Sequence, residues 1–111
     1  MVNRMVYSLA DIQSKIAPIA ISYKLSGVYL FGSYARNEAS EDSDIDLIID
    51  EDKSHMLRGL DMISLQLDLE QALGKKVSLV TVESLESQLS EERWRFVRNA
   101  VKEAICIYER P

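Results

Sequence analysis

A short apolar run that passes directly into glycine and serine constrains this chain most. Val28 to Phe31 is rich in β-branched and aromatic residues, and Gly32 and Ser33 follow at once. We predict a strand that ends at Gly32 and a helix of about one turn over Ser33 to Arg36. Backbone N–H groups at a helix start, with the positive end of the helix dipole behind them, favour a bound anion such as phosphate. The stretch therefore predicts a phosphate site at the end of a strand.

A pair of aspartates follows at the spacing of a second strand. Asp44 and Asp46 lie two residues apart in the run from Asp44 to Asp50, so both side chains leave one face of the sheet. The opposite face would carry Ile45, Leu47 and Ile49. Mg²⁺ prefers oxygen ligands and is commonly held by one or two carboxylates plus substrate phosphates. A phosphate site beside paired carboxylates therefore suits a nucleoside triphosphate carried with Mg²⁺.

Together these pieces resemble the signature of the DNA polymerase beta-like nucleotidyltransferases. The signature consists of Gly32-Ser33, ten intervening residues and Asp44-x-Asp46. Within that superfamily, the Phe-Gly-Ser-Tyr-Ala-Arg run and the Ser-Asp-Ile-Asp-Leu strand resemble the minimal nucleotidyltransferase (MNT) group, which includes antitoxin partners of HEPN-domain toxins. The strong part of the match covers Val28 to Asp50, and a weaker similarity continues to Glu109.

The resemblance implies a role for each matching residue. It implies that Asp44 and Asp46 are the catalytic, Mg²⁺-binding carboxylates. The residues implied to bind the nucleotide are Gly32, Ser33, Arg36 and Ser43. It also implies that the nucleotide is ATP and that the acceptor is a tyrosine hydroxyl on a HEPN toxin, which AMP transfer would silence.

The third predicted strand, Lys76 to Val82, departs from the family pattern. In the superfamily a third carboxylate on this strand completes the metal site and can activate the attacking hydroxyl. Ser78 stands at that position, and serine is neither a strong Mg²⁺ ligand nor a competent base near neutral pH. Val80 and Val82 share its face and cannot replace the missing acid.

The serine leaves three functional hypotheses open. The chain is an active adenylyltransferase antitoxin, a catalytically weakened relative that binds nucleotide or its partner toxin without chemistry, or a small-molecule nucleotidyltransferase. Relatives of the third kind generally need an additional domain to build the acceptor pocket, and 111 residues leave no room for one.

Length, net charge and composition further restrict the class of protein. The length predicts a single domain over residues 1–111. A net charge of −5 argues against a nucleic-acid substrate held through its phosphates. The uncharged run Ile16 to Tyr23 is too short to cross a membrane, and no signal pattern precedes it, so we expect a cytoplasmic protein. The single cysteine, Cys106, lies in an apolar run and is expected to be buried.

We expect an α/β (α+β) fold with a small mixed sheet of at least three strands. Helices would pack mainly on one face and the nucleotide would bind on the other. Ser8 should cap a first helix, with Asp11 in a capping-box position, and Pro18 should end or kink it. Two further helices are expected near Ser84 to Leu89 and over Glu91 to Glu103.

Between these regions we predict a long helix from about His55 to Leu73, capped by Ser54 and closed by Gly74. His55 is expected at the surface. The predicted inward-facing residues of this helix are Met56, Leu57, Leu60, Ile63, Leu67 and Leu73. Oligomeric state is open, although Trp94 and Phe96 point to different sides of their predicted helix and one ring could contact another chain.

Overall fold

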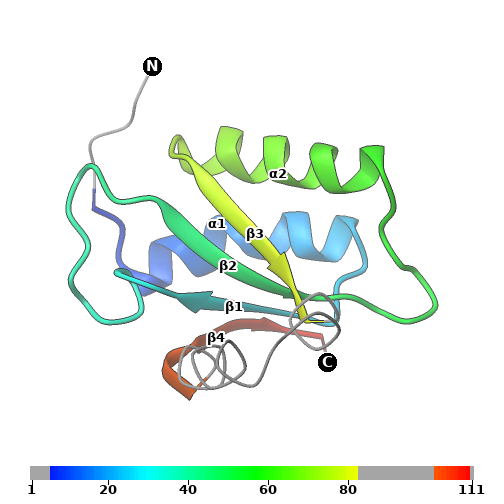
Figure 1. Cartoon of the computed structure of the whole chain (residues 1–111), viewed down its shortest axis with the longest axis horizontal. Coiled ribbons are helices and arrows are strands. Elements are labelled where there is room, and N and C mark those ends of the chain that lie inside the picture. Colours follow the sequence, from blue (N-terminus) through cyan, green and yellow to red (C-terminus); the bar gives the residue numbers. More distant parts are fainter. Residues whose placement is uncertain (1–5, 83–101, 111) are drawn as a thin grey trace, which may run out of the picture.

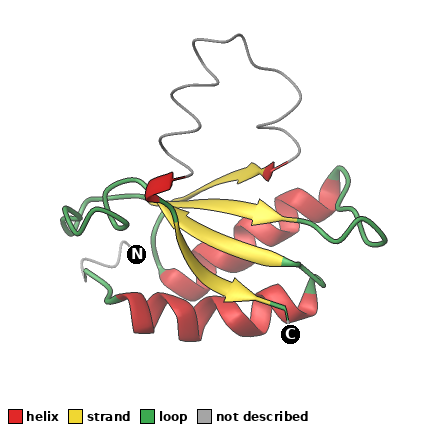
Figure 2. Cartoon of the chain, turned by 90° about the horizontal axis from the view of Figure 1, so that it is seen from below, coloured by secondary structure: helices red, strands yellow, loops and turns green. Residues whose placement is uncertain are grey.

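The structure is a computed structural model, and it describes residues 6–82 and 102–110. A four-stranded mixed sheet has the order β3-β2-β1-β4, and two helices lie together on one side of it (Figures 1 and 2). The elements are α1 (Leu9–Ser22), β1 (Gly27–Phe31), β2 (Ile45–Asp50), α2 (Leu60–Leu73), β3 (Val77–Thr81) and β4 (Ile105–Glu109). The predicted small mixed sheet with helices on one face is therefore confirmed.

Strand pairing brings the predicted site residues together at one end of three neighbouring strands. β1 and β2 are antiparallel and pair Phe31 with Asp46, while β2 and β3 are parallel and pair Asp46 with Ser78. Ile45, Leu47 and Ile49 are fully buried on the opposite face, where the helices pack. Strand alternation therefore turns Asp46 away from the helices. The end of β1 and the starts of β2 and β3 meet around it.

α1 begins with the predicted cap and does not end at its internal proline. Ser8 and Asp11 form the predicted capping box, which is worth about 1 kcal/mol. The sequence predicts that Pro18 ends or kinks the helix; α1 continues through Pro18 to Ser22, so it does not end there. The ring and the Ser14 carbonyl that loses its N–H partner both lie on the exposed side. Water can satisfy that carbonyl, while Ile16 and Ala20 stay buried.

The second helix begins later than predicted. α2 starts at Leu60, its N-cap is Gly59 with φ +53°, and no side chain caps it, so the predicted cap at Ser54 is wrong. The preceding loop has other hydrogen bonds: the Ser54 N–H donates to Asp52 and the Leu57 N–H donates to the Glu51 carboxylate. The predicted end is confirmed, because Gly74 adopts a left-handed conformation as C-cap.

The buried face of α2 also differs from the prediction. Leu65, Leu69 and Leu73 are buried against the sheet. Leu60, Ile63 and Leu67 were expected to face inward, and all are exposed. Of the predicted inward set, only Leu73 is buried, while Met56 and Leu57 lie in the loop before the helix.

The C-terminal strand corrects the expectation for cysteine. Residues 105–109 form β4, an edge strand paired with β1, and in a strand alternate residues face opposite sides. Ile107 is buried on one side, whereas Cys106 is exposed on the other, so the predicted buried thiol is wrong. The helix expected over Ser84 to Leu89, most of the one over Glu91 to Glu103, and Trp94 and Phe96 lie outside the described residues. Within residues 6–82 and 102–110 no helix has the length and apolar character to cross a membrane.

Candidate functional site

Gly32 allows the turn after β1 to approach an aspartate of β2. Its φ is +74°, and a β-carbon at this position would overlap Asp46 Oδ2 and lie 3.3 Å from Asp46 Cγ. Any larger residue would be strained in its backbone and would push the carboxylate away. The glycine of the predicted phosphate site therefore permits close approach to Asp46.

Residues 32–37 form hydrogen-bonded turns, so the predicted one-turn helix after Gly32 is wrong. The Arg36 N–H donates to the Gly32 carbonyl at 3.2 Å, and the Glu38 N–H donates to the Ser33 carbonyl at 2.9 Å. Asn37 has φ +57°, a left-handed conformation that asparagine tolerates and that stops a helix from propagating. Tyr34 is buried beneath the turn and anchors it to the core. Any anion here would depend on the N–H groups of the turn itself.

Asp46 carries a negative charge that its surroundings only partly neutralise. Its half-buried side chain has its pKa raised above the usual value, because burial and the charge of Asp44 both disfavour ionisation. A hydrogen bond from the Ser78 hydroxyl and the charge of Arg36 act in the opposite direction and are weaker. A bound cation would relieve this imbalance, since it would favour the ionised carboxylate.

The other predicted site residues lie around this centre. Asp44 is exposed, two residues before Asp46. Arg36 is exposed and pairs with Glu38 at 3.1 Å. The half-buried Ser43 hydroxyl accepts a hydrogen bond from the Ser40 N–H at 2.9 Å, so Ser43 shapes the loop before β2. The structure therefore groups Gly32, Ser78 and Arg36 around Asp46, with Ser43 at the loop that carries Asp44.

The oxygen donors fit Mg²⁺ only in combination with a substrate. Among the described residues, no group of His, Cys, Asp and Glu side chains has the three or more members that a metal site made of protein alone would need. Asp46 on β2 and Asp44 in the loop just before it offer carboxylate oxygens, and the strand pairing places Ser78 opposite Asp46, where the family pattern predicts a third acid. Mg²⁺ bound with nucleotide phosphates needs only one or two carboxylates. The residues fit a magnesium nucleotide better than a free ion.

An open cleft of about 500 Å³ adjoins Asp44 on the side of β3. It runs between the loop before β2 and the C-terminal end of α2, and its lining includes Gln71, Lys75 and Lys76. Lys75 is buried, and its Nζ donates to the Glu41 carbonyl at 2.8 Å, which ties the loop to the start of β3. The burial of Lys75 is not predictable from the sequence, since a lysine after a helix-ending glycine gives no sign of it.

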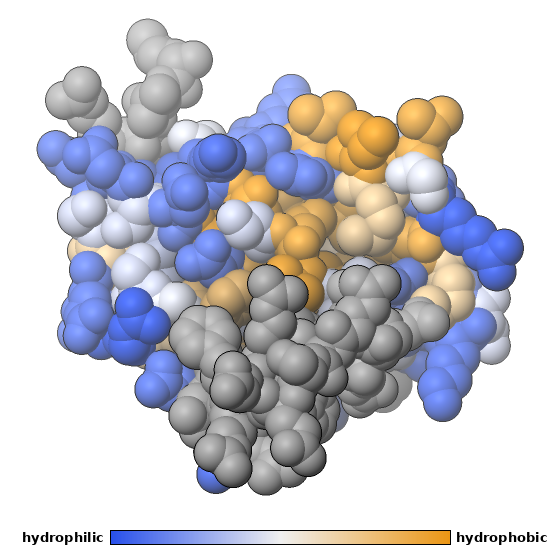
Figure 3. Space-filling model, viewed as in Figure 1, coloured by the Kyte–Doolittle hydropathy of each residue, from blue (hydrophilic) through white to orange (hydrophobic). Residues whose placement is uncertain are grey.

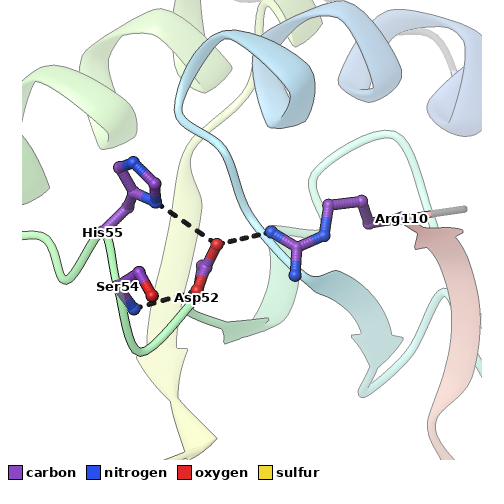
Figure 4. A network of polar contacts seen from close by, with 4 residues as sticks. All are labelled: Asp52, Ser54, His55 and Arg110. Carbon is purple, nitrogen blue, oxygen red and sulfur yellow. Dashed lines mark hydrogen bonds and ion pairs between the residues drawn. The ribbon is translucent and has the colours of Figure 1, made fainter.

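The opposite end of β2 carries a different kind of acidic site (Figure 4). Arg110 donates to Asp52 Oδ2 at 2.6 Å, and His55 Nδ1 lies 3.3 Å from the same oxygen. The Ser54 N–H, followed by the Arg110 guanidinium, holds the pKa of Asp52 well below its usual range. His55 is exposed, as predicted. This network fastens the end of β4 to the loop after β2.

Comparison with known proteins identifies related sequences. The family model described as polymerase beta, nucleotidyltransferase matches residues 14–111. A Methanocaldococcus jannaschii protein whose name assigns it to the protein adenylyltransferases is 37% identical over 84 residues, which cover 76% of this chain and 88% of that protein. The protein adenylyltransferase MntA of Thermococcus cleftensis is 44% identical over 62 residues, covering 56% of this chain and 61% of the relative.

Solved structures with this fold are similar over most of the chain. A minimal nucleotidyltransferase structure has 31% identity and a TM-score of 0.65, and the match covers 89% of this chain and 95% of that one. A toxin-antitoxin crystal structure with AMP-PNP has 26% identity and a TM-score of 0.66, with 88% and 73% coverage. An MNT antitoxin in complex with an AMPylated HEPN toxin from Shewanella oneidensis shares the fold at 24% identity and a TM-score of 0.62, with 92% and 73% coverage.

Proposed function

Because this chain belongs to the polymerase beta nucleotidyltransferase family, we propose that it transfers AMP from ATP, with Mg²⁺, to a tyrosine hydroxyl of a partner HEPN toxin and so acts as an antitoxin. The observation that carries the proposal is the close approach of Gly32 to Asp46, beside the exposed Asp44. This close approach puts the backbone of the turn next to carboxylate oxygens. A triphosphate bound with Mg²⁺ needs both, because backbone N–H groups bind its phosphates and carboxylates hold the cation.

Each residue of the site has a task in this proposal. The turn at Gly32 and Ser33 binds the β- and γ-phosphates through N–H groups and the serine hydroxyl. Arg36 adds positive charge near the phosphates, and Ser43 holds the loop that presents Asp44. Asp44 and Asp46 would hold Mg²⁺, which when bound neutralises phosphate charge and orients the α-phosphate.

The proposed transfer is an in-line displacement at the α-phosphorus. The tyrosine oxygen forms a bond to the α-phosphorus while the bond from the α-phosphorus to the bridging oxygen breaks, and pyrophosphate leaves with that electron pair. The proton of the tyrosine hydroxyl passes to water, since Ser78 is not a competent base. The products are O-adenylyl-tyrosine and pyrophosphate.

The relatives support this choice of nucleotide and acceptor. The similar proteins of Methanocaldococcus jannaschii and Thermococcus cleftensis are named as protein adenylyltransferases, which act on proteins. The toxin-antitoxin structure at 26% identity contains AMP-PNP, an ATP analogue. The MNT-like signature extends the proposal to a HEPN toxin as partner.

A second candidate function is binding without transfer, and Ser78 favours it. Asp46 pairs with Ser78 across the sheet, so the position where a third carboxylate would act is occupied by a hydroxyl. A chain of this kind would still bind nucleotide and partner, and it would neutralise the toxin by occupying it.

One assay separates the two candidates. The purified chain is incubated with Mg²⁺, ATP labelled at the α-phosphate, and the HEPN-domain protein encoded beside it. We expect label on a tyrosine of that protein and release of unlabelled pyrophosphate, while ATP labelled at the γ-phosphate should leave the protein unlabelled. A stable complex that acquires no label from either nucleotide would contradict transfer and support binding alone.

A further inference from the structure

The outward face of α2 carries an apolar stripe that no described element covers. The stripe consists of Leu60, Ile63 and Leu67, whose exposed fractions are 78%, 56% and 59%. Their spacing of three and four residues places them on one side of the helix. Figure 3 shows apolar residues gathered over the right-hand half of α2, the half that contains this stripe.

The stripe is not a misplaced part of the core. Leu65, Leu69 and Leu73 already fill the side of α2 that packs on the sheet and are almost fully buried. The centre of the stripe lies about 150° around the helix from the centre of that buried side, at 3.6 residues per turn. Leaving three large aliphatic side chains in water is unfavourable by about 1.5 to 3 kcal/mol each relative to full burial, so covering them would release free energy.

The same helix face leads toward the catalytic carboxylates. Gln71 follows Leu67 by one turn and lines the cleft that adjoins Asp44. This cleft lies on the β3 side of Asp44, whereas the turn at Gly32 lies on the β1 side. In an in-line displacement the nucleophile enters opposite the leaving group. With pyrophosphate at the turn, the acceptor would come from the β3 side, where the cleft is.

The charges of α2 restrict what can cover the stripe. The helix contains Asp61, Asp68 and Glu70 and has no lysine or arginine. A second copy of the same helix would therefore bring like charges together in a chain that already has a net charge of −5. A partner helix with an apolar stripe edged by lysine or arginine satisfies both the apolar surface and the charge.

From this arrangement we infer that the outward face of α2 is the docking surface for the acceptor protein. A basic-edged amphipathic helix of that protein packs on Leu60, Ile63 and Leu67, and the acceptor chain then enters the cleft beside Gln71 and Lys75. The inference rests on the proposed function, since it names the surface that brings the acceptor to Asp44.

The test measures binding and transfer separately, with the HEPN-domain protein encoded beside this chain as the probe. A variant with Leu60→Ser, Ile63→Ser and Leu67→Ser should bind the probe at least tenfold more weakly than wild type, because a few buried aliphatic anchors dominate such interfaces. It should fold normally and keep its affinity for AMP-PNP with Mg²⁺, since the substituted side chains are exposed.

A matched control lies on the other helix. Ile21 of α1 has an exposed fraction of 63%, close to that of Ile63. Tyr23, two residues later, hydrogen-bonds Asp68 of α2, so Ile21 points about 200° around α1 from that contact. Ile21→Ser should leave binding unchanged.

Several results would overturn the proposal that the outward face of α2 is the docking surface. Binding of the triple variant with wild-type affinity would do so, as would an equal loss in Ile21→Ser, or no binding of the probe by wild type. A wild-type dimer that the triple substitution converts to monomer would assign the stripe to a second copy instead. Label transfer by wild type is scored on its own: its absence, together with stripe-dependent binding, contradicts the proposed chemistry and leaves the docking surface standing.

Discussion

The two ends of β2 carry aspartates with opposite electrostatic surroundings. At the starting end, burial and the neighbouring Asp44 raise the pKa of Asp46. At the other end, Asp52 accepts hydrogen bonds from the Ser54 N–H and the Arg110 guanidinium, which lower its pKa. Asp52 is therefore satisfied within the protein, whereas Asp46 carries charge that a ligand can complement. Acids such as Asp46, whose pKa is raised by burial and a neighbouring like charge, are typical of functional sites.

The largest expected effect comes from removing the charge of Asp46. Asp46→Asn should lower adenylyl transfer by about 10³-fold or more, since a lost metal ligand removes several kcal/mol of transition-state stabilisation. The control is Asp50→Asn on the same strand face, which should change the rate less than about threefold, because it lies at the opposite end of β2. Steady-state kinetics with a folded protein check both. Equal losses of transfer rate in Asp46→Asn and Asp50→Asn would contradict the proposed difference between the two ends of β2.

The next effect tests the close approach of the turn to Asp46. Gly32→Ala should lower activity by about 10²-fold, because its β-carbon would overlap the Asp46 carboxylate and move it by a fraction of an ångström.

Gly59 gives a matched control for backbone strain. Its φ is +53°, and a β-carbon there meets nothing within 4 Å. Gly59→Ala should therefore lose about 1 to 3 kcal/mol of stability through backbone strain alone, yet keep its activity, whereas Gly32→Ala adds the overlap with the Asp46 carboxylate. Thermal melts with parallel rate measurements separate the two effects. Full activity in Gly32→Ala would show that the contact does not matter.

A smaller gain is expected from restoring the third acid. Ser78→Asp should raise turnover about tenfold, because it would place another carboxylate beside Asp46 that can bind metal and accept the acceptor proton. Ser78→Asn has a similar shape without the charge and should give no gain. An unchanged rate in a folded Ser78→Asp variant would count against the absent acid as the factor that limits catalysis.

The smallest expected effects are on the pH dependence of stability, and their signs differ between Asp46 and Asp52, at the two ends of β2. The folded pKa of Asp46 is above the unfolded value of 3.8, so its ionisation opposes folding increasingly as pH rises through and above that value. Asp46→Asn should therefore raise the melting temperature at neutral pH by about a few degrees. The folded pKa of Asp52 is lowered, so its stabilisation is present above the unfolded pKa and disappears as pH falls below it.

Asp52→Asn should accordingly lower the melting temperature at neutral pH and flatten its decline in acid. Melting curves recorded between about pH 3 and pH 7 in the absence of divalent cations check both signs. A drop in neutral stability on Asp46→Asn, or no change on Asp52→Asn, would contradict the assignment of one end to ligand binding and the other to the fold.

The sequence predicts the strands of the site better than the helix beside it. β1 and β2 follow from apolar alternation and a glycine, and Asp46 faces away from the core because the period of a strand leaves only two choices. The large aliphatic residues of α2, five leucines and Ile63, fall on two sides of the helix, and both sets follow helical spacing. Only contact with the sheet decides that Leu65, Leu69 and Leu73 are buried.

Other parts depend on contacts between distant residues, which a single sequence does not reveal. The bond from Lys75 to the Glu41 carbonyl spans 34 residues. The N-cap of α2 is Gly59, so Ser54 lies in the loop before the helix and has no capping role, and its N–H donates to Asp52. Tertiary structure overrides local propensity at these positions. The roles of Gly32, Ser33, Arg36 and Ser43 in nucleotide binding stay predictions.

The most direct test of the central claim is a calorimetric titration of AMP-PNP into the wild-type chain and into Asp46→Asn, each with and without Mg²⁺. We predict that wild type binds at least tenfold more tightly with Mg²⁺ than without it, and that Asp46→Asn loses this dependence because its carboxylate no longer holds the cation. Equal affinity in all four titrations, or a magnesium effect that survives the substitution, would contradict the claim that Asp46 and the turn at Gly32 form a site for a magnesium nucleotide.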